Sequence, residues 1–511
     1  QPGRLGGRPA RPAAERAALT HSPHLTGEAD LQDGALRSQV RSAVIWRSGT
    51  QIVSQLIAWV STFLVIRILS PSDYGLFAMT SVVLVLLGLL NGYGFANAAI
   101  QDKALDTHKL RQLFGLLIVI NGALAAAQYL AAPLVASYYG QPMVADLLRV
   151  QALIYLTNPF LALGYAVLSR QMDFRRQAQV NMASAMLGAL TALAGAFAGW
   201  GVWTLIAAPL VTFASRAAGM MLAAKAWILP TFDFRGARTL ASYGSVIMVG
   251  QVFWFLQTQA DIIIAGRLLQ PGELGLYTTA LFLAQLFVNK VVPPLNEVAF
   301  SAYARIQDDG AAVAQGFLKS VRVVMLLAVP FCLGLAAVAA PAVEVMLGPK
   351  WLGSAPLIQL LALAMPFMTL HVMFAPATNA MGQPGISTRS SILGAIVMPA
   401  AFLAGITLAG LPGVAWAWLL GYPLLTAITA AWSLPTIGVT ARQLGSALGA
   451  PVLAGLAMTA SVLLVDRMLP DLHVAVRLAL LVAAGGAVYG GWLLIFARER
   501  IGEVLGLVLK R

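Results

Sequence analysis

The sequence predicts an all-α polytopic membrane protein of about fourteen transmembrane helices, arranged as two pseudo-symmetric six-helix lobes followed by two extra C-terminal helices. Three observations predict this fold class: the composition, a series of apolar segments and an internal repeat. Of the 511 residues, 59% are hydrophobic and only 10% are charged, and the mean hydropathy is +0.79. A soluble domain carries roughly 25% charged residues, so this composition excludes a water-soluble protein.

Fourteen apolar segments follow one another along the chain, each close to the length of about 20 residues that a helix needs to cross a bilayer. They lie at 44–66, 76–100, 113–133, 147–168, 180–199, 202–223, 242–265, 276–300, 321–341, 355–378, 388–409, 413–433, 445–465 and 475–497. Segment 147–168 is the weakest because Arg149, Gln151 and Asn158 interrupt it. Since the segments occupy most of the chain, no room remains for a separate soluble catalytic domain.

Basic residues are distributed unevenly between the alternate loops that these segments define. With a cytoplasmic N-terminus, eighteen lysines and arginines beyond residue 100 lie on the cytoplasmic side, against six on the other side of the membrane. Cytoplasmic loops are enriched in basic residues, so both termini are expected in the cytoplasm. The net charge of +13 therefore indicates topology in a lipid bilayer, and no nucleic-acid partner is expected.

The segment boundaries predict five parts of the chain. These are a disordered basic tail over 1–40, an N-lobe over 41–225, a C-lobe over 240–435, additional helices over 443–498 and a cytoplasmic tail over 499–511. Residues 1–40 are rich in Arg, Pro, Ala and Gly and contain no apolar block, which is typical of disorder. The single cysteine, Cys332, excludes an intramolecular disulfide, and no metal site is expected.

An internal repeat supports the two lobes. Residues 67–77 (RILSPSDYGLF) and 267–277 (RLLQPGELGLY) are identical at five of eleven positions, at an offset of 200 residues. Six segments separate the copies, so both face the same side, as in transporters whose substrate path runs between parallel repeats. We expect the prolines of the motif to end a helix, the glycines to allow a tight turn, and the arginines to extend to the membrane interface. The residues concerned are Arg67, Pro71, Gly75, Arg267, Pro271 and Gly275.

The sequence lacks the motifs of two classes of membrane protein, ATP-driven transporters and glycan-forming enzymes. It contains no Gly-x-x-x-x-Gly-Lys-Ser/Thr phosphate loop, which excludes ATP as a direct fuel within this chain. A membrane-embedded polysaccharide polymerase or ligase is the enzyme alternative. Such an enzyme needs paired acids or a sizeable outside loop, whereas the first outside loop offers only Asp73. A non-enzymatic function is therefore favoured.

A set of motifs spread along the chain indicates a family. Beside the repeated hairpin, they are VPPL at 292–295, ARIQDD at 304–309, LGPKW at 347–351, PLIQLL at 356–361 and NAMGQP at 379–384. Over about residues 40–435 the chain resembles the Wzx-type polysaccharide flippases of the multidrug, oligosaccharidyl-lipid and polysaccharide exporter superfamily. The resemblance implies a carrier that moves an undecaprenyl-diphosphate-linked glycan, an exopolysaccharide, capsule or O-antigen repeat unit, across the bacterial inner membrane by alternating access, without a cofactor. Polymerase and export machinery are the further partners it implies.

Ionisable residues inside the predicted helices are the candidates for a transport site, because they are costly in lipid and usually face a cavity or a partner. The cations Arg47, Arg216 and Lys290 fall in the cytoplasmic half of the membrane and are candidates for binding the diphosphate. For Arg47 and Arg216 the alternative is extension to lipid headgroups. Lys290 precedes Pro293 and Pro294, which predict a broken helix at that point.

Asp261, Glu297 and His371 are the candidates for coupling to H⁺ or Na⁺. For the two acids the alternative is an ion pair, and for the histidine it is a hydrogen bond to a backbone carbonyl. Polar residues also follow one face of the first helix of each lobe and predict a polar cavity, with interhelical hydrogen bonding as the alternative. They are Gln51, Ser54 and Gln55 in the N-lobe and Gln251, Gln257 and Thr258 in the C-lobe.

Other functions remain open from the sequence. A flippase for a lipid-linked peptidoglycan precursor and a cation-coupled drug antiporter belong to the same superfamily, and the polymerase or ligase belongs to another class. The antiporter predicts an excess of acids in the cavity, whereas three cations here oppose two acids.

Overall fold

The computed structural model describes residues 54–90, 107–233 and 238–496, and over 238–251 the backbone alone. Within these ranges the regular secondary structure is helical, and no strand is assigned. In chain order the helices are Ser54–Ile68, α3 (Pro71–Gly88), α5 (Thr107–Tyr139), α6 (Met143–Gln151), α7 (Leu153–Arg170), α8 (Phe174–Phe197), α9 (Trp203–Ala224), α10 (Arg238–Leu268), α11 (Pro271–Ala284), α12 (Leu286–Arg305), α13 (Gly310–Ala337), α14 (Ala339–Met346), the 3₁₀ turn η1 (Pro349–Ser354), α15 (Ala355–Ala380), α16 (Pro384–Ile437), α17 (Ala441–Met468) and α18 (Val474–Phe496).

The helices of the described residues confirm the coarse part of the predicted fold class, an all-α polytopic membrane protein. Ten of them are long and apolar enough to cross a membrane, or eleven when the bent pair α11 and α12 is counted as one span. The tails predicted over 1–40 and 499–511 lie outside the described residues. The chain is therefore an all-α protein with many candidate spans.

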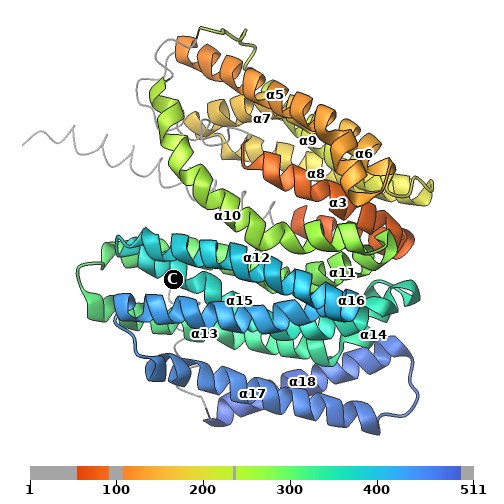
Figure 1. The fold of residues 1–511 in the computed structure, drawn as a ribbon, viewed down its shortest axis with the longest axis vertical. Coiled ribbons are helices and arrows are strands. Elements are labelled where there is room, and N and C mark those ends of the chain that lie inside the picture. The colour runs from red at the N-terminus through yellow and green to blue at the C-terminus, as the bar shows by residue number, and fades with distance from the viewer. Residues whose placement is uncertain (1–53, 91–106, 234–237, 497–511) are drawn as a thin grey trace, which may run out of the picture.

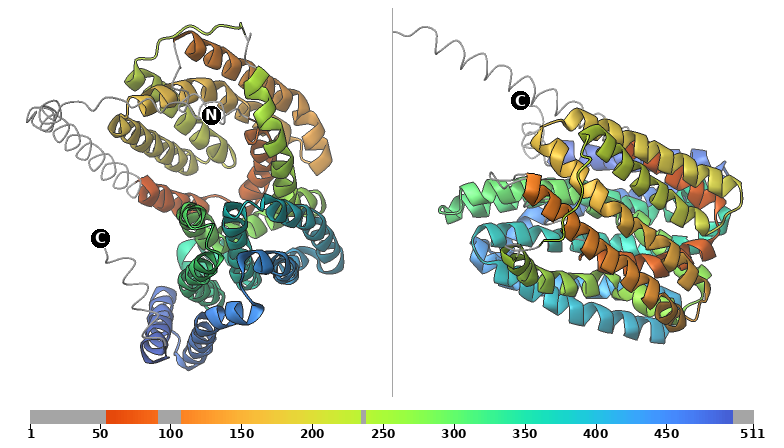
Figure 2. Two further views of the ribbon diagram at one scale, coloured as in Figure 1. Left: turned by 90° about the vertical axis from the view of Figure 1, so that its left-hand side faces the viewer. Right: turned by 90° about the horizontal axis from the view of Figure 1, so that it is seen from above.

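The helices form two groups that lie beside each other (Figure 1). Helices α3 and α5 to α9 belong to the first group, and α11 to α16 belong to the second. Helix α10 packs against α3 of the first group and against α16 of the second, while α3 and α11 pack closely on each other. Helices α17 and α18 pack on each other and on α13, at the edge of the second group that is far from the first (Figure 2).

Helix α16 is two antiparallel arms joined at a glycine. Its 54 residues are interrupted at Gly410, which has a positive φ of 62° that glycine adopts without strain. After the bend the two arms lie side by side. The hydroxyl of Ser390 on the first arm is 2.6 Å from the hydroxyl of Thr429 on the second arm. Near the bend, Gly405 and Gly413 face each other so closely that a Cβ on either would overlap the carbonyl of the other. The two apolar segments predicted at 388–409 and 413–433 correspond to these arms.

A Gly413→Ala substitution is expected to lower the unfolding temperature, because the new methyl overlaps the Gly405 carbonyl and the arms must separate. Overpacking of this kind costs about 1–3 kcal/mol. Gly486 in α18 provides the matched control, because a Cβ added there would have no atom within 4 Å. Gly486→Ala should leave the unfolding temperature of the detergent-solubilised protein unchanged or slightly raised, and equal temperatures for both variants would contradict the close approach.

The break predicted beside Lys290 is wrong in position. Helices α11 and α12 meet at Gln285 with a bend of 41°, and α12 continues through Pro293 and Pro294. Proline removes one backbone donor, but the neighbouring groups can be satisfied in other ways within a membrane helix. The proline pair is therefore a misleading signal for the break.

Candidate transport site

The two copies of the repeat touch each other where α3 crosses α11. A Cβ on Gly75 would overlap the carbonyl of Pro271, and a Cβ on Gly275 would overlap the carbonyl of Pro71. Each glycine therefore packs against the first residue of the other helix, and the contact is the same in both directions. We call this contact the crossing.

The predicted roles of the repeat residues need correction. Gly75 and Gly275 lie inside α3 and α11, so they permit close helix packing and not a tight turn. Pro71 follows the helix that ends at Ile68, but it also occupies the first position of α3, where its missing N–H is not needed. Asp73 accepts a hydrogen bond from the Ser70 backbone N–H at 2.9 Å and completes a capping box.

The arginines of the repeat reach across to the opposite group. Arg67 Nη1 donates a hydrogen bond to the Val345 carbonyl at 2.9 Å. Arg267 lies with its guanidinium carbon 5.9 Å from the centre of the Tyr138 ring. Each copy of the motif therefore contributes an arginine that ties its own group to the other one.

Further bonds at this end hold the first helix to the second group. Trp351, which is fully buried, donates from Nε1 to the Ile66 carbonyl at 2.9 Å. Lys350 Nζ donates to the Ile68 carbonyl at 2.8 Å. Carbonyls at the end of a helix have no partner within it, so these side chains satisfy groups that would otherwise need water. The two groups are closed against each other at the end that carries the crossing.

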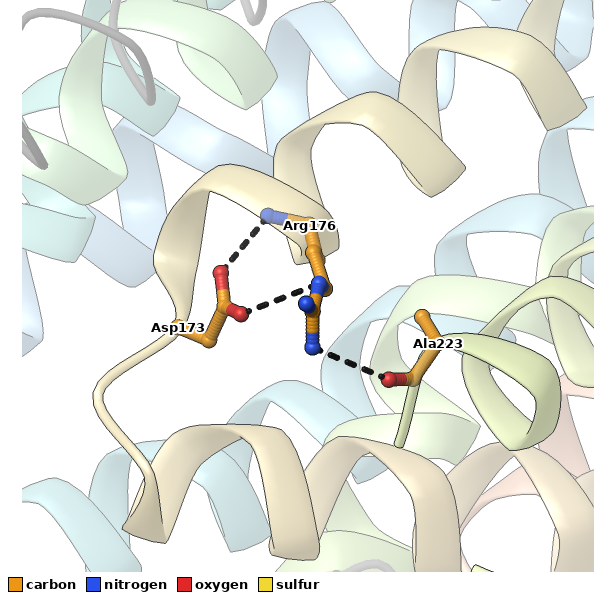
Figure 3. A network of polar contacts seen from close by, with 3 residues as sticks. All are labelled: Asp173, Arg176 and Ala223. Atoms are coloured by element: carbon orange, nitrogen blue, oxygen red, sulfur yellow. Dashed lines mark hydrogen bonds and ion pairs between the residues drawn. The ribbon is translucent and has the colours of Figure 1, made fainter. Parts of the chain in front are cut away.

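At the opposite end, the loops that were predicted to be cytoplasmic fasten neighbouring helices. Arg111 Nε on α5 donates to the Leu229 carbonyl at 2.9 Å in the segment after α9. Asp173 caps α8 and pairs with Arg176 at 3.3 Å, and Arg176 also donates to the carbonyl of Ala223 at the end of α9 (Figure 3). The bonds bring the start of α8 to the end of α9.

A cavity of about 330 Å³ lies within the first group, in the half away from the crossing. We call it the N cavity. It is bounded by the helix Ser54–Ile68, α7, α8 and α9. Its polar lining consists of Ser54, Gln55, Tyr165, Gln177, Asn181 and Arg216. Among the described residues that line it, Arg216 alone is charged, so the N cavity suits an anion.

A second cavity of about 250 Å³ lies within the second group and is bounded by α10, α15 and both arms of α16. We call it the C cavity. The lining includes Trp254, Gln257, His371, Ser390, Tyr422 and Thr429. These helices hold the same places in the second half of the chain as the four helices of the N cavity hold in the first half. The two cavities are therefore equivalent positions of the repeat.

A third cavity, of about 380 Å³, lies beside the crossing and borders both groups. We call it the outer cavity. Tyr74 and Ser81 of α3, Thr204 of α9 and Thr279 of α11 contribute hydroxyl groups to it.

Asp261 is fully buried and belongs to none of the three linings. Its Oδ2 accepts a 2.6 Å hydrogen bond from the Tyr277 hydroxyl, which in turn accepts one from Trp418 Nε1 at 2.7 Å. The Trp418 ring stacks on Tyr422 of the C cavity, with centroids 4.9 Å apart. Among the described residues, Asp261 Oδ1 has no hydrogen-bond partner and no cation pairs with Asp261. The alternative of an ion pair at Asp261 is thus not what the structure shows.

The structure brings some predicted site residues together and separates others. Ser54, Gln55 and Arg216 share the N cavity, and Gln257, Thr258 and His371 share the C cavity. Lys290 and Glu297 are exposed on α12 and belong to none of the three linings. Arg47 and Gln51 lie outside the described residues, and so does the side chain of Gln251.

Tyr277 and Trp418 were missed by the sequence reasoning. A signal was present in the repeat, because Tyr277 stands where the first copy has Phe77, and Asp261 stands where the first half has Ser61. The hydroxyl and the carboxyl are both additions of the second copy, and the structure shows that they meet.

The chain is similar in sequence to a known family and to several characterised proteins. A family described as polysaccharide biosynthesis protein matches residues 64–356. The succinoglycan biosynthesis transport protein of Rhizobium meliloti is 28% identical over 65% of this chain and 67% of its own length. The lipopolysaccharide biosynthesis protein WzxC of Escherichia coli is 23% identical over 80% of this chain and 84% of its own length.

Two solved structures share the fold. The lipid II flippase MurJ in an inward closed conformation has a TM-score of 0.71 at 14% identity and covers 89% of this chain and 100% of its own. An inward-facing transporter of the multidrug resistance MATE family has a TM-score of 0.59 at 13% identity, over 78% of this chain and 98% of its own.

Proposed function

The chain belongs to the polysaccharide biosynthesis protein family, and from this premise we propose that it is a Wzx-type flippase for an undecaprenyl-diphosphate-linked oligosaccharide. The cargo is a repeat unit of an exopolysaccharide, a capsule or an O-antigen, carried from the cytoplasmic to the periplasmic leaflet by alternating access. The observation that carries the proposal is the pair of equivalent cavities, one in each helix group, with a cation in one of them. In transporters built from two such repeats the substrate path runs between the repeats, so the headgroup crosses there while the tail stays in lipid.

The proposed topology has fourteen spans in two six-helix lobes, with α17 and α18 as the additional pair. Both termini lie in the cytoplasm of a bacterium, and the protein resides in the inner membrane. The basic residues at the end opposite the crossing support this orientation, since cytoplasmic loops are enriched in them. They include Arg170, Arg175, Arg176, Lys225 and Arg305. The crossing then closes the periplasmic end.

In this proposal the diphosphate binds first in the N cavity. Arg216 can offer two donors to phosphate oxygens, which gives a stronger and more directed contact than a lysine gives. Lys290, exposed on α12, and Arg47 are proposed as further cations along the entry route. Polymerase and export machinery are proposed to receive the cargo after translocation.

Transport is proposed to be coupled to a cation at Asp261, because an intramembrane carboxylate with no paired cation is a typical site for a proton or Na⁺. An Asp261→Asn variant removes the charge but keeps the hydrogen bond from Tyr277. The stimulation of transport by an imposed proton or sodium gradient should then fall by about tenfold, equal to a coupling free energy of about 1.4 kcal/mol. Uptake is measured in proteoliposomes with and without each gradient. Glu297→Gln, at an exposed acid, is the matched control, and equal stimulation in both variants would reject Asp261 as the coupling site.

The proposed function is tested by reconstituting the full chain in proteoliposomes with a labelled undecaprenyl-diphosphate oligosaccharide. Access of the sugar to an impermeant glycosidase should rise at least tenfold over empty liposomes. Selective movement of a peptidoglycan precursor, gradient-driven export of cationic drugs, or formation of glycosidic bonds by the purified protein would each replace this proposal with one of its alternatives.

A further inference from the structure

We propose that the C cavity binds a sugar of the cargo and that this sugar is uncharged, while the N cavity holds the diphosphate. The inference rests on the proposed function, because it assigns two chemically different parts of one cargo to two equivalent sites. The argument comes from the contrast between the two linings.

The two cavities differ in charge although the repeat makes them equivalent. In the N cavity, α9 contributes Arg216, whereas the corresponding arm of α16 contributes Thr429 and Ser433 to the C cavity. Among the described residues, the lining of the C cavity includes no aspartate, glutamate, lysine or arginine. A phosphate or a uronic acid would be buried there without a fixed opposite charge, which is costly. A neutral polar ligand avoids this cost.

The hydroxyl groups of the C cavity are arranged to accept hydrogen bonds. Thr258 donates to the Trp254 carbonyl at 2.9 Å, Thr378 to the Phe374 carbonyl at 3.2 Å, and Ser387 to the Pro384 carbonyl at 2.8 Å. Each hydroxyl has one proton and two lone pairs, so its acceptor capacity remains after the proton is used. A ligand rich in O–H groups, such as a hexose, is the complement of this lining.

Two more groups lack a partner among the described residues. Ser433 Oγ and His371 Nδ1 are buried atoms with no hydrogen bond, and both belong to residues that line the C cavity. Buried polar atoms nearly always have a hydrogen-bond partner. Two such atoms without a partner in one cavity therefore point to a ligand that supplies the missing hydrogen bonds.

An aromatic ring borders the same cavity. Trp254 lines it and is 47% exposed, so one part of the indole is available for contact. The cavity of about 250 Å³ is several times the share of about 30 Å³ that one water occupies in the liquid. This volume suits a single pyranose ring and not a whole oligosaccharide, so the remaining sugars would lie outside it.

The test compares two lipids on the same full-length protein: undecaprenyl diphosphate, and undecaprenyl diphosphate carrying a short neutral oligosaccharide of glucose, galactose or N-acetylglucosamine. Dissociation constants are measured by native mass spectrometry of the detergent-solubilised chain. The ratio of the two constants reports what the sugar adds. In the unmodified protein, at least one of the neutral sugars should tighten binding by about tenfold or more, and a glucuronic acid should not.

A Ser390→Ala, Thr429→Val double variant should remove about fivefold of that gain and leave binding of bare undecaprenyl diphosphate unchanged. The two hydroxyls bond each other at 2.6 Å, so replacing both by apolar groups of similar shape leaves no orphaned partner in the fold. Trp254→Ala should reduce the gain similarly. Trp416→Ala, at a tryptophan that is also 47% exposed but does not line the C cavity, is the matched control and should keep the full gain.

Failure of this inference and failure of the proposed function give different results. If no neutral sugar tightens binding, or if the C cavity variants keep the whole gain, the sugar site is rejected while diphosphate binding stands. If the unmodified protein binds neither lipid, the proposed flippase function itself is rejected. An equal loss for both lipids in Trp254→Ala and Ser390→Ala, Thr429→Val would also overturn the assignment, because it would indicate damage common to all binding.

Discussion

A Gly75→Ala variant is expected to open the end of the protein that carries the crossing. The added methyl overlaps the Pro271 carbonyl, so α3 and α11 must separate at the crossing. Overpacking costs about 1–3 kcal/mol, and each 1.4 kcal/mol is a factor of about ten in a population. The closed arrangement should therefore lose about five- to 150-fold in population relative to an arrangement in which the crossing has parted.

The opening can be measured with a thiol reporter in the outer cavity. Ser81→Cys lines that cavity, and the native Cys332 is buried and should stay silent. An impermeant maleimide added on the side of the membrane that carries the crossing, the periplasmic side in the proposed topology, should modify the reporter at least fivefold faster when Gly75→Ala is present.

The same helix supplies the control for this experiment. Gly88, the last residue of α3, has no atom near a Cβ position. Gly88→Ala should leave the modification rate unchanged. A properly folded Gly75→Ala protein whose reporter reacts at the control rate would show that the crossing does not hold its end of the protein closed. Gly275→Ala added to Gly75→Ala should give less than the sum of the two effects, since both act on one contact.

An Arg216→Gln variant is expected to lose most of its affinity for the diphosphate lipid. Hydrogen bonds to charged groups contribute about 1.5–3 kcal/mol, so the dissociation constant for undecaprenyl diphosphate should rise about ten- to 150-fold. Glutamine keeps the length and polarity of the side chain but not its charge or its paired donors. Binding is measured with the bare lipid, and transport with the oligosaccharide-bearing one.

Arg442→Gln is the matched control for the charge. Arg442 is exposed near the start of α17 and does not line the N cavity. The Arg442→Gln variant loses the same charge and should bind the lipid as the unmodified protein does. If Arg216→Gln binds and transports as the unmodified protein does, and the Arg216→Gln, Lys290→Ala double variant does so as well, the positively charged path is rejected.

The sequence predicted those features that depend on residues close together in the chain. Apolar length located the helices, and Gly410 falls in the gap between two predicted segments, where the structure has its bend. Helical spacing grouped Ser54 with Gln55 and Gln257 with Thr258, and the structure places each pair at one cavity. In these cases, the periodicity of one helix was enough to identify a common face.

Features that depend on contacts between distant segments could not be predicted. The repeat showed that Gly75 and Gly275 correspond, but only the fold shows that the two copies meet, 200 residues apart in the chain. The same is true of the hydrogen bond between Tyr277 and Asp261, which joins α10 to α11. Exposure is also a property of the fold, so Lys290 and Glu297 could not be separated from Arg216 by their depth along a helix.

The bonds donated by Arg67, Lys350 and Trp351 give the closed arrangement a modest and reversible advantage in free energy. Their acceptors are carbonyls at the ends of helices, for which water is an adequate substitute, so parting these bonds hydrates the groups and does not strand them. Three such exchanges amount to roughly 3 kcal/mol in total, a bias of about 100 to 1. Such a bias is small enough for the binding energy of an arriving cargo to overcome, and it favours the closed arrangement when the carrier is empty.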